Sequence, residues 1–192
     1  MGRFLIGLAV LVLAIIGGIS AALFSLNLGG PLPTDKDVAG WSISEAVATA
    51  SGSARSRALW AQSAFAAGPP SHVLYFFRTM AENGHTLEGG CRYRLTGVPP
   101  DAAWWSLTVY DDKLALIGST GNRSINPDTV QLEDDGSVTV YISAVPEPGN
   151  WLSDRSAGEI SIVFRVFEPS HELVKTPSKL MLPRVVQSGG CA

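Results

Sequence analysis

One long stretch without charge near the start of the chain limits what the protein can become. Phe4 to Leu26 are 23 consecutive residues without a charged side chain, and the next charge after Arg3 is Asp35. A helix of this length rises roughly 35 Å, at ~1.5 Å per residue. Since about 20 apolar residues suffice to cross the hydrocarbon core of a bilayer, the sequence predicts a transmembrane anchor over residues 1–28.

A cleaved signal peptide is the alternative for this segment. Arg3 supplies the positive start, and Ser20-Ala21-Ala22 resembles a cleavage site. The apolar run is longer than that of an ordinary signal peptide, however, and it continues to Leu26. Positive charge favours the cytoplasmic side of a membrane, and here Arg3 precedes the span while Asp35 follows it. Both alternatives therefore place the rest of the chain outside the cytoplasm.

The residues after the span are enough for one domain with its own core. Without Arg3 the exported part keeps 13 of the 14 basic residues against 17 acidic ones, so its net charge is −4. A mildly acidic surface is a poor match for a phosphate backbone, and we expect no nucleic-acid partner. The three histidines share no metal-ligand spacing, and we expect neither a metal nor a cofactor.

The chain has two cysteines, Cys91 and Cys191. In an oxidising compartment a lone pair of this kind indicates one disulfide, which would close a loop of about 100 residues. Two unrelated thiols, with Cys91 buried in a strand, are the alternative.

The exported part divides into three segments. Residues 29–40 read as a linker, because Gly29-Gly30-Pro31 breaks the helix. Residues 41–70 are rich in alanine and read as a helical or irregular lead-in, with candidate helices near 45–48 and 54–65. Residues 71–192 alternate apolar and polar side chains between turn signals, which is typical of an antiparallel β-sandwich or barrel. The predicted strands cover residues 72–77, 91–95, 103–110, 113–117, 137–143 and 159–167, and the tail 178–192 is expected to be irregular.

Several of these strands resemble one bacterial family. The segments are Cys91-Arg92-Tyr93-Arg94-Leu95-Thr96-Gly97, Trp104-Trp105-Ser106-Leu107-Thr108-Val109-Tyr110-Asp111, Asp135-Gly136-Ser137-Val138-Thr139-Val140, Pro148-Gly149-Asn150-Trp151-Leu152 and Phe164-Arg165-Val166-Phe167. Together they are similar to the uncharacterised family catalogued as domain of unknown function 1214, over about residues 72 to 185. The resemblance implies a mainly β fold, a jelly-roll-like sandwich behind a membrane anchor. It also implies a bacterial inner-membrane protein whose C-terminal domain lies in the periplasm. It supplies no catalytic residues.

The candidate binding residues come from loops and from the second faces of strands. Trp104 and Tyr110 share one face of their strand, and Arg165 alternates out of phase with its apolar neighbours. The complete set is Trp104, Tyr110, Asp111, Asn122, Arg123, Asn150, Trp151 and Arg165. A tryptophan platform with arginine and asparagine nearby would suit a sugar ring or an anionic head group. The alternative is structural: Trp151 plugs one end of the sandwich, and Asn150 caps a loop through backbone hydrogen bonds.

Two functions follow from these observations. The first is a single-pass, envelope-facing module that binds or scaffolds a periplasmic protein, a glycan or a lipid head group without catalysis. The second is an envelope enzyme that acts on carbohydrate or another small substrate. The sequence favours the first, because no nucleophile elbow, phosphate loop or acid/base pair stands out.

Overall fold

The computed structural model describes residues 2–27, 36–43, 65, 68–117, 122–155 and 158–191. The helices are α1 (Gly2–Asn27), α3 (His171–Lys175) and the 3-10 turn η1 (Pro177–Lys179). The strands are β1 (Lys36–Val38), β2 (Trp41–Ile43), β3 (Val73–Arg78), β4 (Cys91–Gly97), β5 (Ala102–Asp111), β6 (Ser124–Ile125), β7 (Val138–Ser143), β8 (Asn150–Ser153), β9 (Ile160–Pro169) and β10 (Arg184–Cys191). The candidate helices near 45–48 and 54–65 lie outside the described residues, except for Phe65.

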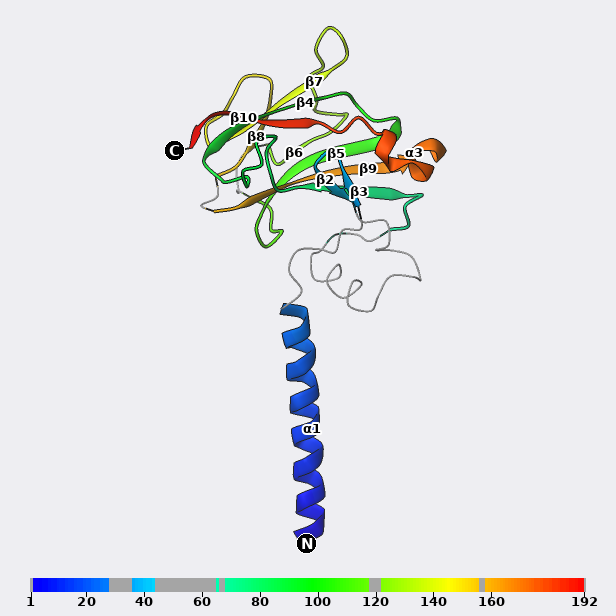
Figure 1. Ribbon diagram of the computed structural model, residues 1–192, viewed down its shortest axis with the longest axis vertical. Coiled ribbons are helices and arrows are strands. Elements are labelled where there is room, and N and C mark those ends of the chain that lie inside the picture. The colour runs from blue at the N-terminus through cyan, green and yellow to red at the C-terminus, as the bar shows by residue number, and fades with distance from the viewer. Residues whose placement is uncertain are drawn as a thin grey trace.

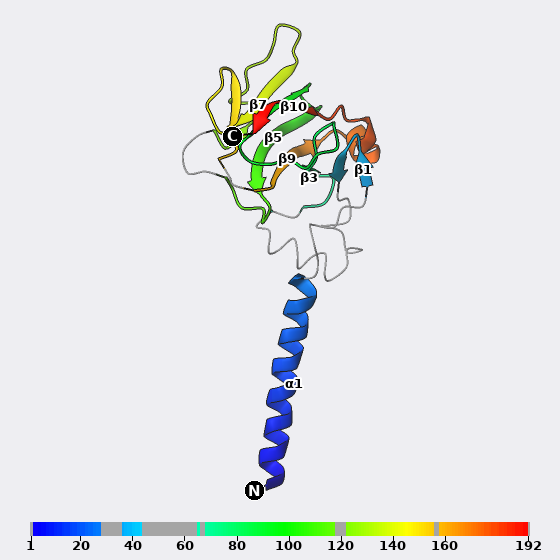
Figure 2. The same ribbon diagram turned by 60° about the vertical axis from the view of Figure 1, so that its left-hand side comes forward.

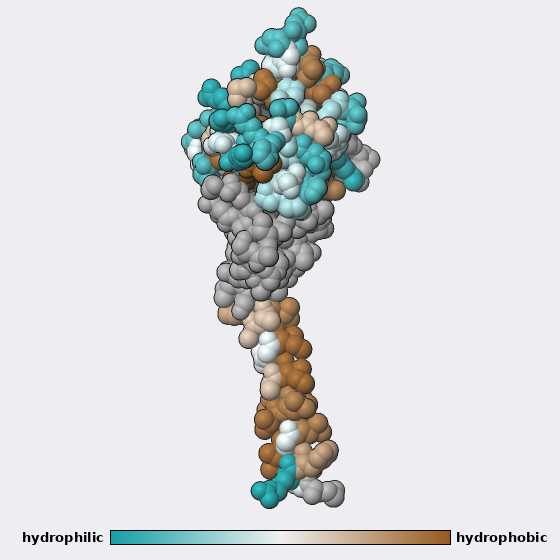
Figure 3. All heavy atoms as spheres, turned by 90° about the vertical axis from the view of Figure 1, so that its right-hand side faces the viewer, coloured by the Kyte–Doolittle hydropathy of each residue, from teal (hydrophilic) through white to brown (hydrophobic). Residues whose placement is uncertain are grey.

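The N-terminal helix is apolar on all sides, and its residues up to Phe24 are exposed. Its segment Gly2–Phe24 has a mean hydropathy of 2.7 and no buried residue. Figure 3 shows it as an almost unbroken apolar rod below the mixed surface of the β-domain. A helix that is apolar all round needs an apolar environment. The expected anchor segment is therefore present as a helix long enough to cross a membrane, although a signal sequence would share these properties.

Two sheets form the β-domain, which confirms the mainly β prediction (Figures 1 and 2). One sheet has six strands in the order β1-β2-β3-β9-β5-β6, and the other has four in the order β10-β4-β7-β8. Neighbouring strands are antiparallel except for β7 and β8, which run parallel with Tyr141 beside Trp151. The two-sheet arrangement fits the predicted sandwich, and the parallel pair is a departure from the purely antiparallel expectation.

The core lies between the two sheets and follows the alternation of the strands. On the central strand β9, Ile162, Phe164 and Val166 are buried in this core, and Leu107 of β5 is buried beside them. Other members of the core are Trp41, Leu74, Phe76, Tyr93, Leu95, Trp105, Val109, Val140, Ile142, Leu152 and Val185. Because β5 and β9 are long and central, their opposite faces can carry a second cluster of side chains.

The six-stranded sheet begins earlier in the chain than the expected boundary at residue 71. β1 lies in the segment expected as a linker, and β2 lies in the expected helical or irregular lead-in. The β1–β2 turn uses Gly40, whose φ is +78° and whose missing Cβ leaves room for the Arg78 guanidinium. Buried Arg78 donates a hydrogen bond to Ala39 O at 2.7 Å and pairs with Glu82. These contacts hold the short hairpin against the rest of the domain.

The C-terminal tail is a strand, which corrects the expectation of an irregular segment. β10 pairs with β4 from Arg184 to Gln187, and the pairing resumes at Cys191 after a shift in register. Cys91 and Cys191 form the expected disulfide, which closes 100 residues. Position 189 favours glycine, because a Cβ there would lie 3.1 Å from the Arg92 side chain. Gly189 therefore reflects close packing against Arg92 rather than a loop.

Candidate functional site

The outer face of the six-stranded sheet carries a second apolar cluster, on the side away from the main core. It is built from the alternate residues of the strands, such as Tyr75 of β3, Val163 of β9 and Tyr110 of β5. Phe65 packs on this face, with ring centroids 5.3 Å from Tyr110 and 5.8 Å from Tyr75. One side of the sheet thus buries aromatic rings outside the sandwich core.

Arg165 lies at the centre of this outer face. Its guanidinium carbon is 5.0 Å from the ring centroid of Phe65, 5.3 Å from that of Tyr110 and 5.8 Å from that of Tyr75. Its Nη1 donates to Thr108 Oγ1 at 3.3 Å, and its Nη2 donates to the Tyr110 hydroxyl. Cation–π contacts of this kind favour a charged guanidinium in a partly desolvated place. We call Phe65, Tyr75, Thr108, Tyr110 and Arg165 the Arg165 cluster.

Burial raises the pKa of Tyr75 above its ordinary value, and the positive charge of Arg165 offsets part of that rise. Both effects have a simple cause: a phenolate loses hydration when it is buried, and a nearby cation stabilises it. Tyr75 therefore stays neutral and serves the cluster as a ring and a hydroxyl.

Trp104 and Asp111 lie on the same strand as Tyr110 but make separate contacts. Trp104 packs edge-on against Phe167 at 5.3 Å, and its indole N–H donates to Asp128 Oδ2 at 3.4 Å. The Asp111 carboxylate accepts from the backbone N–H groups of Lys113 and Ala115 at 3.0 and 2.7 Å. Asp111 therefore stabilises the turn after β5, a common role for aspartate.

Asn150 and Trp151 belong to β8 of the four-stranded sheet, so the structure does not bring them to the Arg165 cluster. The buried Asn150 side chain accepts from Gln131 N and donates to Gln131 O, both at 2.7 Å, and donates to Thr139 O at 2.9 Å. The Trp151 indole N–H donates to Ser143 O and Oγ, each at 3.1 Å. These bonds match the structural alternative, in which Asn150 caps a loop.

Asn122 and Arg123 lie beside β8 rather than beside Arg165. The carbonyl of Asn122 accepts a long hydrogen bond from Ser153 N at 3.5 Å, and the side chains of Asn122 and Arg123 are exposed. Six of the eight candidate residues thus divide between the two sheets, and Asn122 and Arg123 lie in the loop before β6. Among the eight, Tyr110 and Arg165 are joined by a side-chain contact. The sequence pattern did not identify Phe65, Tyr75 and Thr108 as site residues. The strand pattern could have pointed to two of them, because Tyr75 and Thr108 lie on the same face of the sheet as Arg165.

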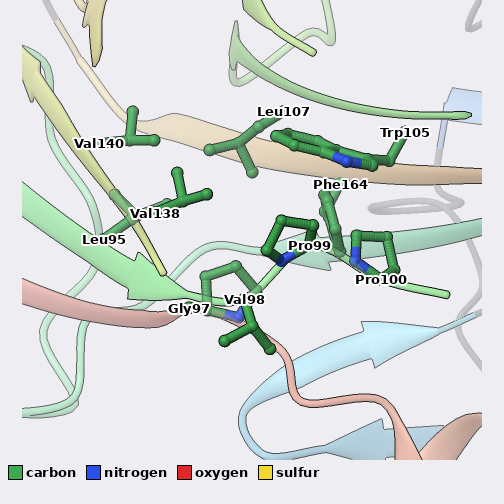
Figure 4. Close-up of a pocket in the computed structure, with 11 residues that line it drawn as sticks. Leu95, Gly97, Val98, Pro99, Pro100, Trp105, Leu107, Val138, Val140 and Phe164 are labelled. Carbon is green, nitrogen blue, oxygen red and sulfur yellow. The ribbon is translucent and has the colours of Figure 1, made fainter. Parts of the chain in front are cut away.

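A small pocket opens at one end of the sandwich, between the sheets. Figure 4 shows Trp105 of the six-stranded sheet facing Pro99 and Pro100 of the β4–β5 loop, with Leu95 and Val140 to the left of them. Its lining is apolar and its volume is about 20 Å³. A water molecule needs roughly 10–15 Å³, so this pocket has room for a water-sized group rather than for a sugar.

Asp154 is the one fully buried carboxyl group among the described residues, and no sequence pattern pointed to it. It directly follows β8, it is 0% exposed, and neither carboxyl oxygen has a hydrogen-bond partner in the described part of the chain. Burial raises the pKa of Asp154 to about 6. The backbone amides of Gly90 and of Asp154 itself oppose part of this rise, although neither meets the geometry of a hydrogen bond to the carboxyl group. A carboxyl in this setting favours its neutral form.

Replacing Asp154 by asparagine should make the domain more stable at neutral pH. A folded pKa of about 6 exceeds the ordinary 3.8, so the native state binds the proton more tightly than the unfolded chain does. The contribution of the protonated Asp154 to stability is then fully present below pH ~3.8 and is lost as the pH rises through ~6. Two pKa units correspond to about 3 kcal/mol. Urea midpoints measured from pH 4 to pH 8 should fall for the wild type and stay flatter for Asp154→Asn.

Asp135→Asn is the matched control for this measurement. Asp135 accepts from Ser137 N at 2.9 Å in an exposed turn, and hydrogen bonds from Ser137 lower its pKa. Its replacement should not raise stability at pH 8. Equal pH profiles for the wild type and Asp154→Asn would contradict a buried carboxyl at this position.

Comparison with known proteins extends these observations. A family model described as "Protein of unknown function (DUF1214)" matches residues 72–171, which is more than half of the chain. The match begins just before β3 and ends at the start of α3, so it covers Arg165 and every described residue of its cluster except Phe65. No curated protein matches the chain.

One solved structure resembles the chain in fold, and a second gives a weaker match. The VPA0106 protein from Vibrio parahaemolyticus is 19% identical with a TM-score of 0.56, over 63% of this chain and 32% of that one. A putative uncharacterized protein from Burkholderia cenocepacia is 20% identical with a TM-score of 0.42, over 64% and 31% respectively. The chain therefore spans about a third of the length of each of these two proteins.

Proposed function

Because the chain belongs to the family described as "Protein of unknown function (DUF1214)", we propose for it the role of a single-pass, membrane-anchored binding module. In this proposal α1 stays in the bacterial inner membrane, and the β-domain faces the periplasm, where it binds or scaffolds without catalysing a reaction. The observation that carries the proposal is the apolar helix Gly2–Phe24, none of whose residues is buried by the rest of the protein.

Charge and cysteine chemistry support the periplasmic side. Arg3 precedes the helix and Asp35 follows it, which favours a cytoplasmic amino end. The Cys91–Cys191 disulfide is of the kind that persists in an oxidising compartment such as the periplasm. The β-domain also keeps a half-buried cation on its outer sheet face, Arg165, for which the described residues provide no ion pair.

A topology reporter tests this proposal. Alkaline phosphatase fused after Ala192 should be active, because it needs the periplasm to form its own disulfides, and the full-length chain should remain in the membrane fraction. A fluorescent protein that matures only in the cytoplasm should stay dark at the same position. In the matched variant Arg3→Glu/Asp35→Lys, the charge difference across the span is reversed, and phosphatase activity should fall.

Three results would overturn parts of the proposal. An inactive phosphatase would contradict the periplasmic side, and a soluble full-length chain would contradict the anchor. Loss of about 22 residues from the amino end would identify a cleaved signal peptide.

An envelope enzyme acting on carbohydrate is the second candidate. The observation in its favour is Asp154, because carboxyl groups with a strongly raised pKa gather at catalytic sites. Its complete burial argues against contact with a substrate in this conformation. Turnover of glycans or esters by the full chain in nanodiscs, lost in Asp154→Asn, would replace the binding proposal by the enzymatic one.

A further inference from the structure

The strands of the four-stranded sheet carry positive charge alone. β4 and β10 contain Arg92, Arg94 and Arg184, and none of β4, β7, β8 and β10 contains an acidic residue. The strands of the six-stranded sheet are balanced, with three basic and three acidic residues. Since the exported part of the chain has a net charge of −4, the four-stranded sheet is a basic region of an acidic domain. A local positive potential of this kind favours an anionic ligand.

The three arginines lie on the outer face of this sheet, because they alternate with side chains of the main core. Arg92 is held by Glu147 through hydrogen bonds at 2.6 and 3.1 Å. Arg184 lies 3.8 Å from a carboxylate oxygen of Glu82. Arg94 is exposed, and its side chain has neither a hydrogen bond nor an ion pair in the described part of the chain. The five N–H donors of its guanidinium are therefore available to a ligand.

Two aromatic side chains continue across the sheet from Arg94. In the register of the strands Arg94 lies opposite Tyr141, and Tyr141 lies beside Trp151. The Arg92 guanidinium is 5.0 Å from the ring centroid of Tyr141, which holds that ring in place. Trp151 is half-buried, and two hydrogen bonds from its indole N–H to Ser143 fix the edge of the ring. We call Arg94, Tyr141 and Trp151 the outer-face row.

The outer-face row lies on a part of the sheet that solvent reaches. Arg94 and Thr96 are exposed on β4, and Tyr141 is partly exposed on β7. In Figures 1 and 2, α3 lies at one end of the sandwich rather than across these strands. Because neighbouring strands are ~4.8 Å apart, Arg94 and Trp151 are roughly 10 Å apart across the sheet. A ligand that contacts both is therefore elongated.

The side chains of the row determine the chemistry of that ligand. A guanidinium holds a carboxylate through two parallel N–H bonds. An indole offers a flat apolar face of negative potential, which attracts the C–H groups on the face of a sugar ring. The Tyr141 hydroxyl, between the two, can donate or accept a hydrogen bond. A chain of sugar rings that carry carboxylates matches all three groups, whereas a lipid head group without a ring would use the arginines alone.

From these contacts we propose that the outer face of the four-stranded sheet binds an acidic oligosaccharide. Arg94 would hold a carboxylate, Trp151 would stack on a neighbouring sugar ring, and Tyr141 would bind a hydroxyl between them. Arg184 lies opposite Thr96, one position along the same face from Arg94, and would attract a second carboxylate. This inference rests on the proposed binding function and names the class of ligand.

Calorimetric titration of the full chain in nanodiscs of neutral lipid tests the inference. The probe is trigalacturonate, three linked sugar rings that each carry a carboxylate, and its methyl triester is the neutral counterpart of the same shape. We expect the acid to bind about tenfold more tightly than the ester or better, because the ester lacks charge-assisted hydrogen bonds. Arg94→Gln should weaken binding of the acid about tenfold, and Arg94→Lys should weaken it less, since it keeps the charge but loses the planar fork.

Variants of the aromatic residues test the other part of the row. Trp151→Ala should weaken trigalacturonate binding about fivefold, and Trp151→Phe should weaken it less, because it keeps an aromatic face. If Trp151→Ala fails to fold without its bonds to Ser143, Arg94→Gln and Tyr141→Phe keep the test decisive, since both alter partly or fully exposed groups. Lys113→Gln removes an exposed cation from the turn after β5 and should leave binding unchanged.

The possible outcomes separate this inference from the proposed function. Equal binding of acid and ester, or unchanged binding in the Arg94 and Trp151 variants, would overturn it. Absence of trigalacturonate binding to the folded wild type would overturn it as well. Tighter binding to phosphatidylglycerol vesicles, lost in Arg94→Gln, would assign the face to an anionic membrane instead. The phosphatase reporter answers a different question, so an active reporter with failed titrations would remove the oligosaccharide site and leave the membrane topology intact.

Discussion

Replacing Trp41 by alanine is expected to lower the free energy of unfolding by about 3–5 kcal/mol, the usual cost of removing a large aromatic side chain from a core. Trp41 is 0% exposed, and its ring centroid lies 6.3 Å from that of Phe164 in the main core. Its indole N–H also donates to Pro183 O at 2.8 Å. The substitution would leave a cavity and would remove the hydrogen bond to the partly buried Pro183 carbonyl. Urea unfolding of the full chain in detergent, followed by pulse proteolysis, measures the loss.

Two control variants separate the contributions of Trp41. Trp41→Phe keeps most of the buried ring and loses the hydrogen bond to Pro183, so its cost should be near ~1 kcal/mol. Trp104→Ala removes an indole of the same size from a half-buried position on the outer face, and it should cost clearly less than Trp41→Ala. If Trp41→Ala unfolded at the same urea concentration as the wild type, β2 would not belong to the core.

Removing the disulfide is the second change with a large expected effect. The double variant Cys91→Ala/Cys191→Ala opens a closed loop of 100 residues. Chain-entropy estimates put the loss at up to ~4.7 kcal/mol, and about 2–4 kcal/mol is typical. We expect the effect to be strongest at the end of β10, because Ser188 to Cys191 are exposed and their pairing with β4 is interrupted.

Hydrogen exchange and urea midpoints measure this effect together. Amides at the end of β10 should lose protection before those of β5 and β9 do. A reductant should shift the wild type toward the double variant and should leave the double variant unchanged. The urea midpoint of the wild type could also stay unchanged in reductant although both thiols are shown to be free. That result would contradict a stabilising role for the disulfide.

The long strands could be predicted from the sequence because their two faces differ. In β5 and β9 an apolar side chain recurs at every second position, and that alternation correctly placed Trp105, Leu107 and Phe164 in the core. It also placed Arg165 on the opposite face. The sequence could not show that Tyr75 of β3 and Tyr110 of β5 reach the same arginine, because the strand order β3-β9-β5 depends on pairings between distant segments.

The missed elements have local sequences that point elsewhere. β2 has three residues and precedes an alanine-rich stretch, so local preference indicated a lead-in rather than a strand. In β10, Pro183 and Gly189-Gly190 are ordinary signals for an irregular tail, but pairing with β4 and the disulfide outweigh them. For Asn150, the sequence left open both a binding role and a loop cap, and its three hydrogen bonds to backbone groups are those of a cap.

The contact between Trp41 and Pro183 sets the order in which a growing chain can fold. The two residues are 142 positions apart, and β3 must likewise wait for β9 before it has its central partner. During synthesis the amino-terminal strands therefore emerge long before the segments that complete them. The domain can reach its final stability only after nearly the whole polypeptide has left the ribosome, so its early strands need protection from wrong pairing until then.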